Sequence, residues 1–269
     1  MGIRISGKEL AEQLYISIAE DMNQLPQKPS LGIIVVGLDP VIESFVGIKK
    51  RSAERLGVPF IRIDLPDTVS QEELNANVHT LNAAHDGVIV QLPIPKHLSV
   101  EDSLSCIDPS RDVDALNPTI PELGKAVHAP VAEAIMEILK TSGVDPKKKK
   151  AVVVGAGRLV GAPTAILLDQ AGADVHMVTL EQGKLEDAQD ADILVSGAGK
   201  AGLIQPEHVK EGSILIDAGT SELAKKITGD IDPLCYDKCA FYTPVPGGVG
   251  PVAVAMIFKN LVKLVKARG

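Results

Sequence analysis

The stretch "KAVVVGAGRLVGAPTAILLDQAG" (150–172) determines how the second half of the chain is expected to fold. An apolar strand leads into three glycines, after which the apolar residues follow helical spacing. Glycines at such a turn let the backbone approach a pyrophosphate, which the helix N-terminus then faces. The spacing G-x-G-x-x-x-G is one residue longer than the common dinucleotide motif, and a tight βα turn in any parallel sheet can also require glycine. Both interpretations remain open from this stretch alone.

Strand and helix patterns alternate on either side of this stretch. Each expected strand is an unbroken apolar run, which is typical of parallel sheets covered on both faces. The clearest runs are "LGIIVVG" (31–37), "DGVIVQLP" (86–93), "ADILVSGAG" (191–199) and "SILIDAG" (213–219). The sequence therefore predicts an α/β protein of two domains, each a mainly parallel sheet flanked by helices, the second of Rossmann type.

The expected domain boundaries follow from this alternation. The first domain is predicted to span 1–120 and to be completed by the amphipathic C-terminal segment 244–269. The second is predicted to span 121–243. Parallel sheets bind ligands beyond the carboxyl ends of their strands, so Gln91 lies where a ligand is expected.

Composition excludes several classes of function. The net charge of −8 lacks the basic face that a nucleic-acid partner requires. Three cysteines form neither an even disulfide set nor a zinc spacing, so we expect no metal and a cytoplasmic, reducing location. No apolar run is long enough for a membrane span, and no signal peptide is recognisable.

Glu181 follows the strand after the glycine turn, where the adenosine ribose of a dinucleotide is expected. A carboxylate there accepts the 2′-hydroxyl of NAD and repels the 2′-phosphate of NADP. Glu181 can equally point to solvent, and Arg158 or Lys184 can supply a positive charge. The residues therefore favour NAD without excluding NADP.

Five segments, in this order and at these separations, resemble the bifunctional methylenetetrahydrofolate dehydrogenase/methenyltetrahydrofolate cyclohydrolase family. The resemblance covers nearly the whole chain. The segments are "DGVIVQLPIPKH" (86–97), "RDVDALNP" (111–118), "VVVGAGRLVGAP" (152–163), "ILIDAGT" (214–220) and "TPVPGGVGPVAVAM" (243–256).

The resemblance implies a role for individual residues. Lys49 corresponds to the family's catalytic lysine, Gln91 to the glutamine that reaches it, and Asp114 to the carboxylate that binds the pterin ring. The substrate-binding positions are Phe45, Leu92, Pro93, Pro246, Gly247 and Gly248. The cofactor-binding positions are Gly155, Ala156, Gly157, Gly161, Glu181 and Thr220.

The chain departs from the family pattern at several of these positions. Phe45 replaces a tyrosine whose hydroxyl assists the lysine, so we expect weakened hydrolysis and retained dehydrogenase activity. Ile42 replaces a serine, and Val131 replaces a threonine that lies near the nicotinamide. Ala156 replaces an arginine that binds the 2′-phosphate, which agrees with the interpretation of Glu181, although NADP is the family's usual cofactor.

The implied activity is oxidation of 5,10-methylenetetrahydrofolate with NAD or NADP, followed by hydrolysis of the methenyl product to 10-formyltetrahydrofolate. The resemblance also implies a homodimer with a small-molecule folate substrate. Two alternatives remain: a folate-binding regulatory protein on the same fold, and another two-domain NAD(P)-dependent dehydrogenase. Retention of Lys49, Gln91 and Asp114 together argues against the regulatory protein, because binding alone has little need of the lysine.

Overall fold

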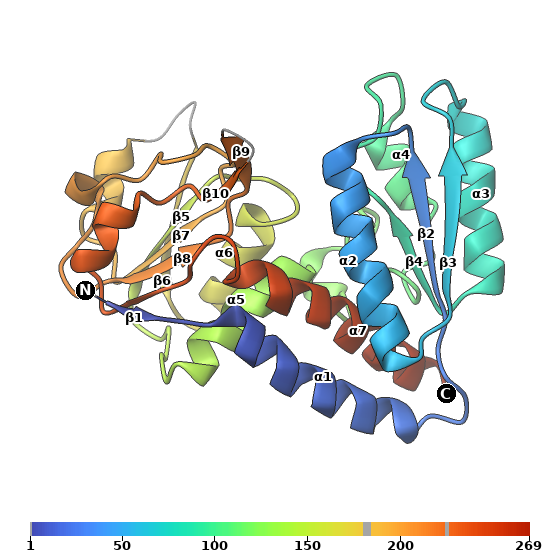
Figure 1. Ribbon diagram of the computed structural model, residues 1–269, viewed down its shortest axis with the longest axis horizontal. Coiled ribbons are helices and arrows are strands. Elements are labelled where there is room, and N and C mark those ends of the chain that lie inside the picture. The colour runs from blue at the N-terminus through green and yellow to red at the C-terminus, as the bar shows by residue number, and fades with distance from the viewer. Residues whose placement is uncertain (1, 180–183, 224–225) are drawn as a thin grey trace. The chain divides into compact units, whose positions relative to one another are not determined.

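The computed structural model describes residues 2–179, 184–223 and 226–269, which form two compact units. The large-sheet unit consists of Met1–Gln13 and Val131–Ala253, and the small-sheet unit consists of Leu14–Pro130 and Val254–Gly269. Both contain mainly parallel sheets flanked by helices, as the sequence predicts (Figure 1).

The small-sheet unit is built on three parallel strands in the order β3-β2-β4. The strands are β2 (Leu31–Val36), β3 (Phe60–Leu65) and β4 (Gly87–Val90), and the helices between and after them are α2 (Pro40–Leu56), α3 (Gln71–Ala84) and α4 (Val100–Ser105). Every residue of β2 and β4 is buried. Apolar side chains of α3 and α4 pack on these strands to form one core. Burial of these continuous apolar runs is the main force that holds the sheet together.

Helix α2 begins and ends where its sequence predicts. The Asp39 carboxylate accepts hydrogen bonds from the backbone nitrogens of Val41 and Ile42 at 2.7 and 3.1 Å, which caps the helix N-terminus. Pro40 occupies the first turn, where its missing N–H costs nothing. Gly57 ends the helix in the left-handed conformation, with φ 66°. These residues set the two ends of α2 and therefore the positions of Phe45 and Lys49 along it.

The large-sheet unit contains six parallel strands in the order β1-β11-β8-β7-β5-β6. The strands are β1 (Ile3–Arg4), β5 (Lys150–Val154), β6 (Asp174–Val178), β7 (Ile193–Ser196), β8 (Ile214–Asp217) and β11 (Phe241–Tyr242). Two further strands, β9 (Ser221–Leu223) and β10 (Lys226–Thr228), pair with each other as a separate antiparallel hairpin. Three short 3₁₀ helices lie in the large-sheet unit: η2 (Leu185–Ala188), η3 (Pro206–His208) and η4 (Pro233–Asp237). Another, η1 (Glu122–Gly124), lies in the small-sheet unit. A separate buried apolar cluster forms the core of this unit.

The remaining helices are α1 (Gly7–Asn23), α5 (Pro130–Thr141), α6 (Gly161–Gln170) and α7 (Val249–Arg268). The division between units falls within α1 and α7 and at the start of α5. Segments 1–13 and 244–253, expected in the first domain, belong to the large-sheet unit, and segment 121–130, expected in the second domain, belongs to the small-sheet unit. Residues 1–13 join the large-sheet unit because β1 pairs with β11, a contact between distant segments that local patterns do not indicate.

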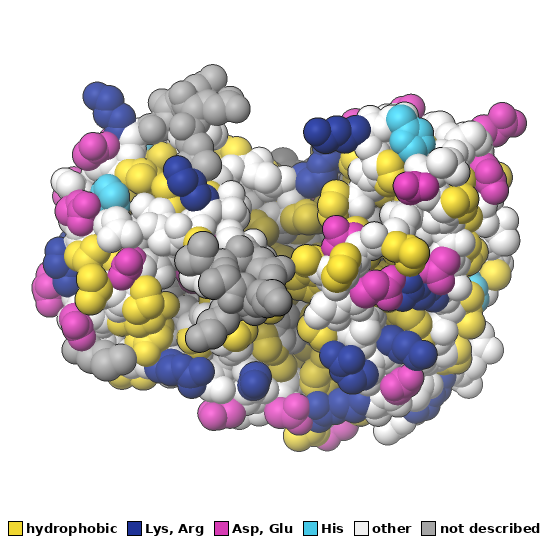
Figure 2. All heavy atoms as spheres, turned by 45° about the horizontal axis from the view of Figure 1, so that its top comes forward, with side chains coloured by type: hydrophobic (Ala, Val, Ile, Leu, Met, Phe, Trp, Pro, Cys, Tyr) yellow, Lys and Arg dark blue, Asp and Glu magenta, His cyan; other side chains and the backbone are white. Residues whose placement is uncertain are grey.

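Charged side chains of both signs are mixed over the face shown in Figure 2. Within the described part of the chain, no helix combines the length and apolar character needed to cross a membrane.

Candidate active site

Lys49 and Gln91 meet at the carboxyl end of the small sheet. Lys49 lies on α2, and Gln91 directly follows the buried strand β4. Lys49 Nζ donates a 2.6 Å hydrogen bond to Gln91 Oε1. Gln91 Nε2 donates to the backbone oxygen of Leu92 at 2.7 Å, which orients the amide so that its oxygen faces the lysine. The strand therefore delivers a neutral acceptor to the lysine, in the contact that the family resemblance implies.

Asp114 interacts electrostatically with Lys49, and both side chains are half-buried. Burial lowers the pKa of the Lys49 ammonium, and the Asp114 carboxylate opposes this change. Burial also raises the pKa of Asp114, and the Lys49 charge opposes that change. A lysine with a lowered pKa exchanges protons closer to neutral pH, as general acid–base catalysis requires.

Phe45 lies one helical turn before Lys49 and carries no hydroxyl. Its side chain is 39% exposed, and Val41 and Ile48 on the same helix are also exposed. Helix α2 therefore presents apolar side chains beside the lysine. Ile42 is buried in the core, so packing accounts for an apolar residue at the position of the family's serine.

Leu92 and Pro93 directly follow Gln91. Leu92 is half-buried and packs against the core of the small-sheet unit, whereas Pro93 is exposed. The peptide bond between them is cis. Both residues therefore directly follow Gln91 in the chain, and their predicted contact with the substrate stays a prediction.

Asp112 is a buried carboxylic acid that the sequence interpretation missed. Its Oδ2 accepts a 2.7 Å hydrogen bond from the backbone nitrogen of Asn117, while its buried Oδ1 has no partner. Between these residues Ala115 adopts a left-handed φ of 56°. Burial raises the pKa of Asp112 to about 7, and the charge of Asp114 adds to the rise. The signal available in the sequence was the spacing of two aspartates, Asp112 and Asp114, in an apolar segment.

The glycine-rich turn joins β5 to α6 as predicted. Gly155 has φ +98°, and a methyl group on Gly161 would lie 1.8 Å from the Gly155 oxygen, so the turn is too tight for side chains. A methyl group on Gly157 would meet nothing within 4 Å. The space above Gly157 and the N-terminus of the ten-residue helix α6 suit a pyrophosphate. The residues present therefore fit a dinucleotide.

The other predicted cofactor residues are placed in part. Ala156 is exposed on the glycine turn, and Thr220 is exposed after β8. Both lie at the carboxyl ends of strands in the large sheet, where a dinucleotide is expected. Glu181 lies outside the described residues.

Pro246, Gly247 and Gly248 belong to the large-sheet unit, whereas Lys49, Gln91 and Asp114 belong to the small-sheet unit. Gly247 has φ +102°, and its oxygen accepts a 3.0 Å hydrogen bond from the backbone nitrogen of Gly7. This loop therefore packs against the start of α1. Its predicted contact with folate stays a prediction.

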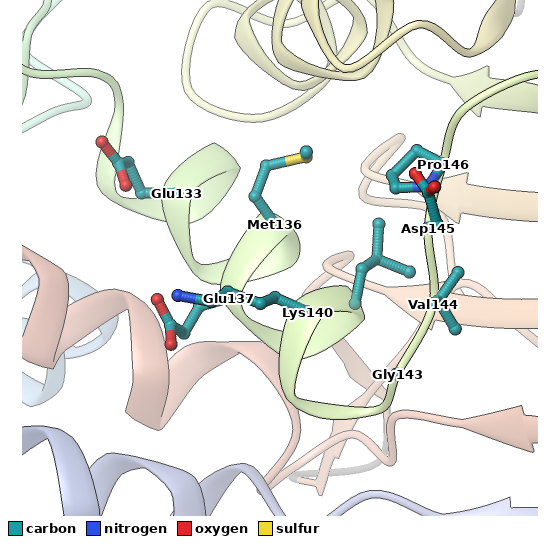
Figure 3. Close-up of a pocket in the computed structure, with 9 residues that line it drawn as sticks. Glu133, Met136, Glu137, Lys140, Gly143, Val144, Asp145 and Pro146 are labelled. Atoms are coloured by element: carbon teal, nitrogen blue, oxygen red, sulfur yellow. The ribbon is translucent and has the colours of Figure 1, made fainter.

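A pocket of about 460 Å³ lies beside α5 (Figure 3). Glu133, Met136 and Pro146 are among the residues that line it, and none of the predicted site residues does so. Among the described residues, no cluster of three or more His, Cys, Asp or Glu side chains is placed to hold a metal ion.

The glycine turn on a parallel sheet, together with a lysine–glutamine–aspartate group in a second unit, defines a two-domain protein of the dinucleotide-dependent dehydrogenase class. Family models place it more narrowly. Residues 5–114 match the tetrahydrofolate dehydrogenase/cyclohydrolase catalytic domain, and residues 129–269 match the NAD(P)-binding domain of the same family. The chain therefore belongs to the tetrahydrofolate dehydrogenase/cyclohydrolase family.

Relatives match over nearly the full length. The bifunctional protein FolD of Nitratiruptor sp. is 38% identical, with 98% of each chain covered. The solved structure of the bifunctional FolD from Campylobacter jejuni has a TM-score of 0.95 at 32% identity, with all of both chains covered. The Trypanosoma brucei enzyme, solved with NADP and an inhibitor, has a TM-score of 0.93 at 32% identity, covering 99% of this chain and 98% of its own.

Proposed function

We propose that the chain oxidises 5,10-methylenetetrahydrofolate with NAD(P)⁺ and then hydrolyses the methenyl product to 10-formyltetrahydrofolate, the second step being the weaker one. The observation that carries this proposal is the 2.6 Å hydrogen bond between Lys49 Nζ and Gln91 Oε1, within the part of the chain that matches the catalytic domain. A lysine of lowered pKa with a fixed neutral acceptor is suited to proton transfer.

The first step depends mainly on positioning. NAD(P)⁺ supplies the hydride acceptor. In this proposal Asp114 accepts a hydrogen bond from the pterin, and Leu92, Pro93 and Phe45 contact the substrate beside it. Such contacts hold the one-carbon bridge in one orientation, which is the contribution a protein makes to hydride transfer.

The second step needs an acid–base residue. Water adds to the methenyl carbon and loses one proton, which leaves a hydroxyl on that carbon. The hydroxyl then loses its own proton as the carbonyl forms, and one ring nitrogen receives a proton as its bond to the carbon breaks, so that one proton is released overall. Lys49 Nζ takes a proton from the oxygen and delivers one to the ring nitrogen, and Gln91 holds the amine toward the reacting atoms. Phe45 leaves the amine without the hydroxyl that assists it in the family. This residue supports the weaker hydrolysis.

The proposed cofactor preference is NAD. Ala156 at the glycine turn brings no positive charge to a 2′-phosphate, and Glu181 at the end of the next segment is expected to accept the ribose hydroxyl. The proposal also includes a reducing, cytoplasmic location, which the three free cysteines support. A homodimer is proposed from the family resemblance.

A pair of neighbouring lysines provides the test. Lys49→Ala removes the proposed proton carrier, and Lys50→Ala removes an exposed lysine from the same turn of α2. We expect enzymatic hydrolysis of methenyltetrahydrofolate to fall at least about 100-fold in the first variant and to stay within twofold in the second. Equal hydrolysis rates in both variants would remove Lys49 from the mechanism. Folate binding by the wild-type protein without turnover would instead favour a regulatory protein.

A further inference from the structure

Asp230 is fully buried in the large-sheet unit and accepts four hydrogen bonds from one short segment. Its Oδ2 accepts from Ser196 Oγ at 2.8 Å and from the backbone nitrogens of Ala198 and Gly199 at 2.8 and 3.1 Å. Its Oδ1 accepts from the backbone nitrogen of Lys200 at 2.8 Å. A single carboxylate therefore fixes the conformation of residues 196–200, which end β7 and form the loop after it.

This β7 loop, residues 197–200, lies against the glycine turn. A methyl group on Gly155 would lie 2.9 Å from the Gly197 oxygen and 3.0 Å from the Ala198 nitrogen. A methyl group on Gly197 would lie 2.4 Å from Val160 Cγ1. The loop and the turn are therefore packed without room for side chains between them. Both follow neighbouring strands, β7 and β5, at the carboxyl edge where a dinucleotide binds in such sheets.

Asp217, at the end of β8, holds Asp230 in turn. Its Oδ1 accepts from the backbone nitrogens of Gly219 and Asp230 at 3.0 and 3.2 Å. Its Oδ2 accepts from the backbone nitrogen of Ile231 at 2.9 Å. Two buried carboxylates thus connect the ends of β7 and β8. The backbone donors offset only part of the cost of burying two acids so close together, because burial and the charge of Asp230 still raise the pKa of Asp217 to about 7.

From this geometry we infer that Asp230 is a positioning residue for the dinucleotide, holding the β7 loop as the wall of the cofactor site beside the glycine turn. This inference rests on the proposed function, because it assumes that a dinucleotide binds at this edge. The role requires both carboxylate oxygens of Asp230 as hydrogen-bond acceptors. An amide has one accepting oxygen, and its NH₂ group would face backbone N–H donors with which it cannot bond.

The test compares two carboxylates that flank the same strand. Asp230→Asn disrupts the loop contacts at the carboxyl end of β7. Asp192→Asn is the control at its amino end, where the carboxylate accepts from the Lys150 backbone nitrogen and from Lys210 Nζ. Dinucleotide binding is measured by NADH and NADPH fluorescence, which the chain's lack of tryptophan simplifies. Hydrolysis of methenyltetrahydrofolate, which consumes no dinucleotide, is measured on the same samples.

For Asp230→Asn we expect Kd and KM for both dinucleotides to rise about tenfold or more, with hydrolysis within twofold of wild type. Asp192→Asn should leave the dinucleotide Kd, the dinucleotide KM and the hydrolysis rate unchanged. If Asp230→Asn fails to fold, Ser196→Ala removes one of the four donors and should raise the dinucleotide Kd severalfold.

If Asp230→Asn binds the dinucleotides with wild-type affinity, the inference is overturned and the proposed function still stands. Where Asp230→Asn does not fold, wild-type affinity in Ser196→Ala has the same meaning. A parallel loss of dinucleotide binding and of hydrolysis would also overturn it, because that result indicates a purely structural role. A wild-type protein that binds neither NADH nor NADPH would contradict the proposed function itself, and the inference with it.

Discussion

Replacing Gln91 by glutamate changes the charge next to Lys49 with almost no change in shape. The acceptor oxygen lies 2.6 Å from the lysine nitrogen. At that distance two unit charges attract by about 6 kcal/mol at an effective dielectric constant near 20. Because Lys49 is only half-buried, we discount this to about 3 kcal/mol, which lowers the neutral fraction of the amine roughly 100-fold.

We therefore expect Gln91→Glu to reduce hydrolysis of methenyltetrahydrofolate about 100-fold at neutral pH and to regain rate as the pH rises. The rate is regained at higher pH because a carboxylate at position 91 raises the pKa of Lys49, which burial lowers in the wild type. The assay is the rate of loss of methenyltetrahydrofolate between pH 6 and 9, corrected for spontaneous hydrolysis. Gln91→Met is the control, because it removes the acceptor without adding charge and should not move the pH dependence to higher pH. A Gln91→Glu profile that coincides with that of wild type would refute the reasoning.

Three further predictions concern other residues. Phe45→Tyr restores a hydroxyl one turn before Lys49, so enzymatic hydrolysis should rise about tenfold while dinucleotide reduction changes less than twofold; an unchanged ratio of the two rates would contradict this. Ala156→Arg adds a partner for a 2′-phosphate and should lower the KM for NADP about tenfold without improving that for NAD, as initial rates would show. Asp112 has a native pKa of about 7 against an ordinary value of 3.8, so the native state binds more protons between these values and loses stability as pH rises through them. Relative to wild type, Asp112→Asn should therefore gain about 2 kcal/mol of unfolding free energy between pH 5 and 8 in urea titrations; the same difference at both pH values would contradict it.

Local sequence patterns were sufficient to predict most of the architecture. Strands such as β2 and β4 are continuous apolar runs because both faces of their sheet are covered, so the burial is visible in the sequence. The limits of α2 were equally predictable, because Asp39, Pro40 and Gly57 act within one turn of their own positions. The Lys49–Gln91 contact followed from the family resemblance and from the position of Gln91 at a strand end.

Contacts between distant segments were not predictable in this way. The pairing of β1 with β11 involves only two residues on each strand, too few to leave a pattern. Asp112 and Asp230 are ordinary acidic residues in the sequence. Their importance comes from burial and from backbone donors, and in Asp230 those donors lie about 30 residues away along the chain. Only the folded structure shows these contacts.

The most direct test of the proposed function is one experiment on the wild-type protein. The initial rate of dinucleotide reduction with 5,10-methylenetetrahydrofolate is measured with NAD and NADP in parallel, while methenyltetrahydrofolate is followed in the same cuvette. We predict substrate-dependent reduction, faster with NAD, and accumulation of the methenyl product because Phe45 slows its hydrolysis. Reduction without methenyl accumulation would contradict the weakened second step, and no reduction with either dinucleotide would contradict the assignment as a dehydrogenase.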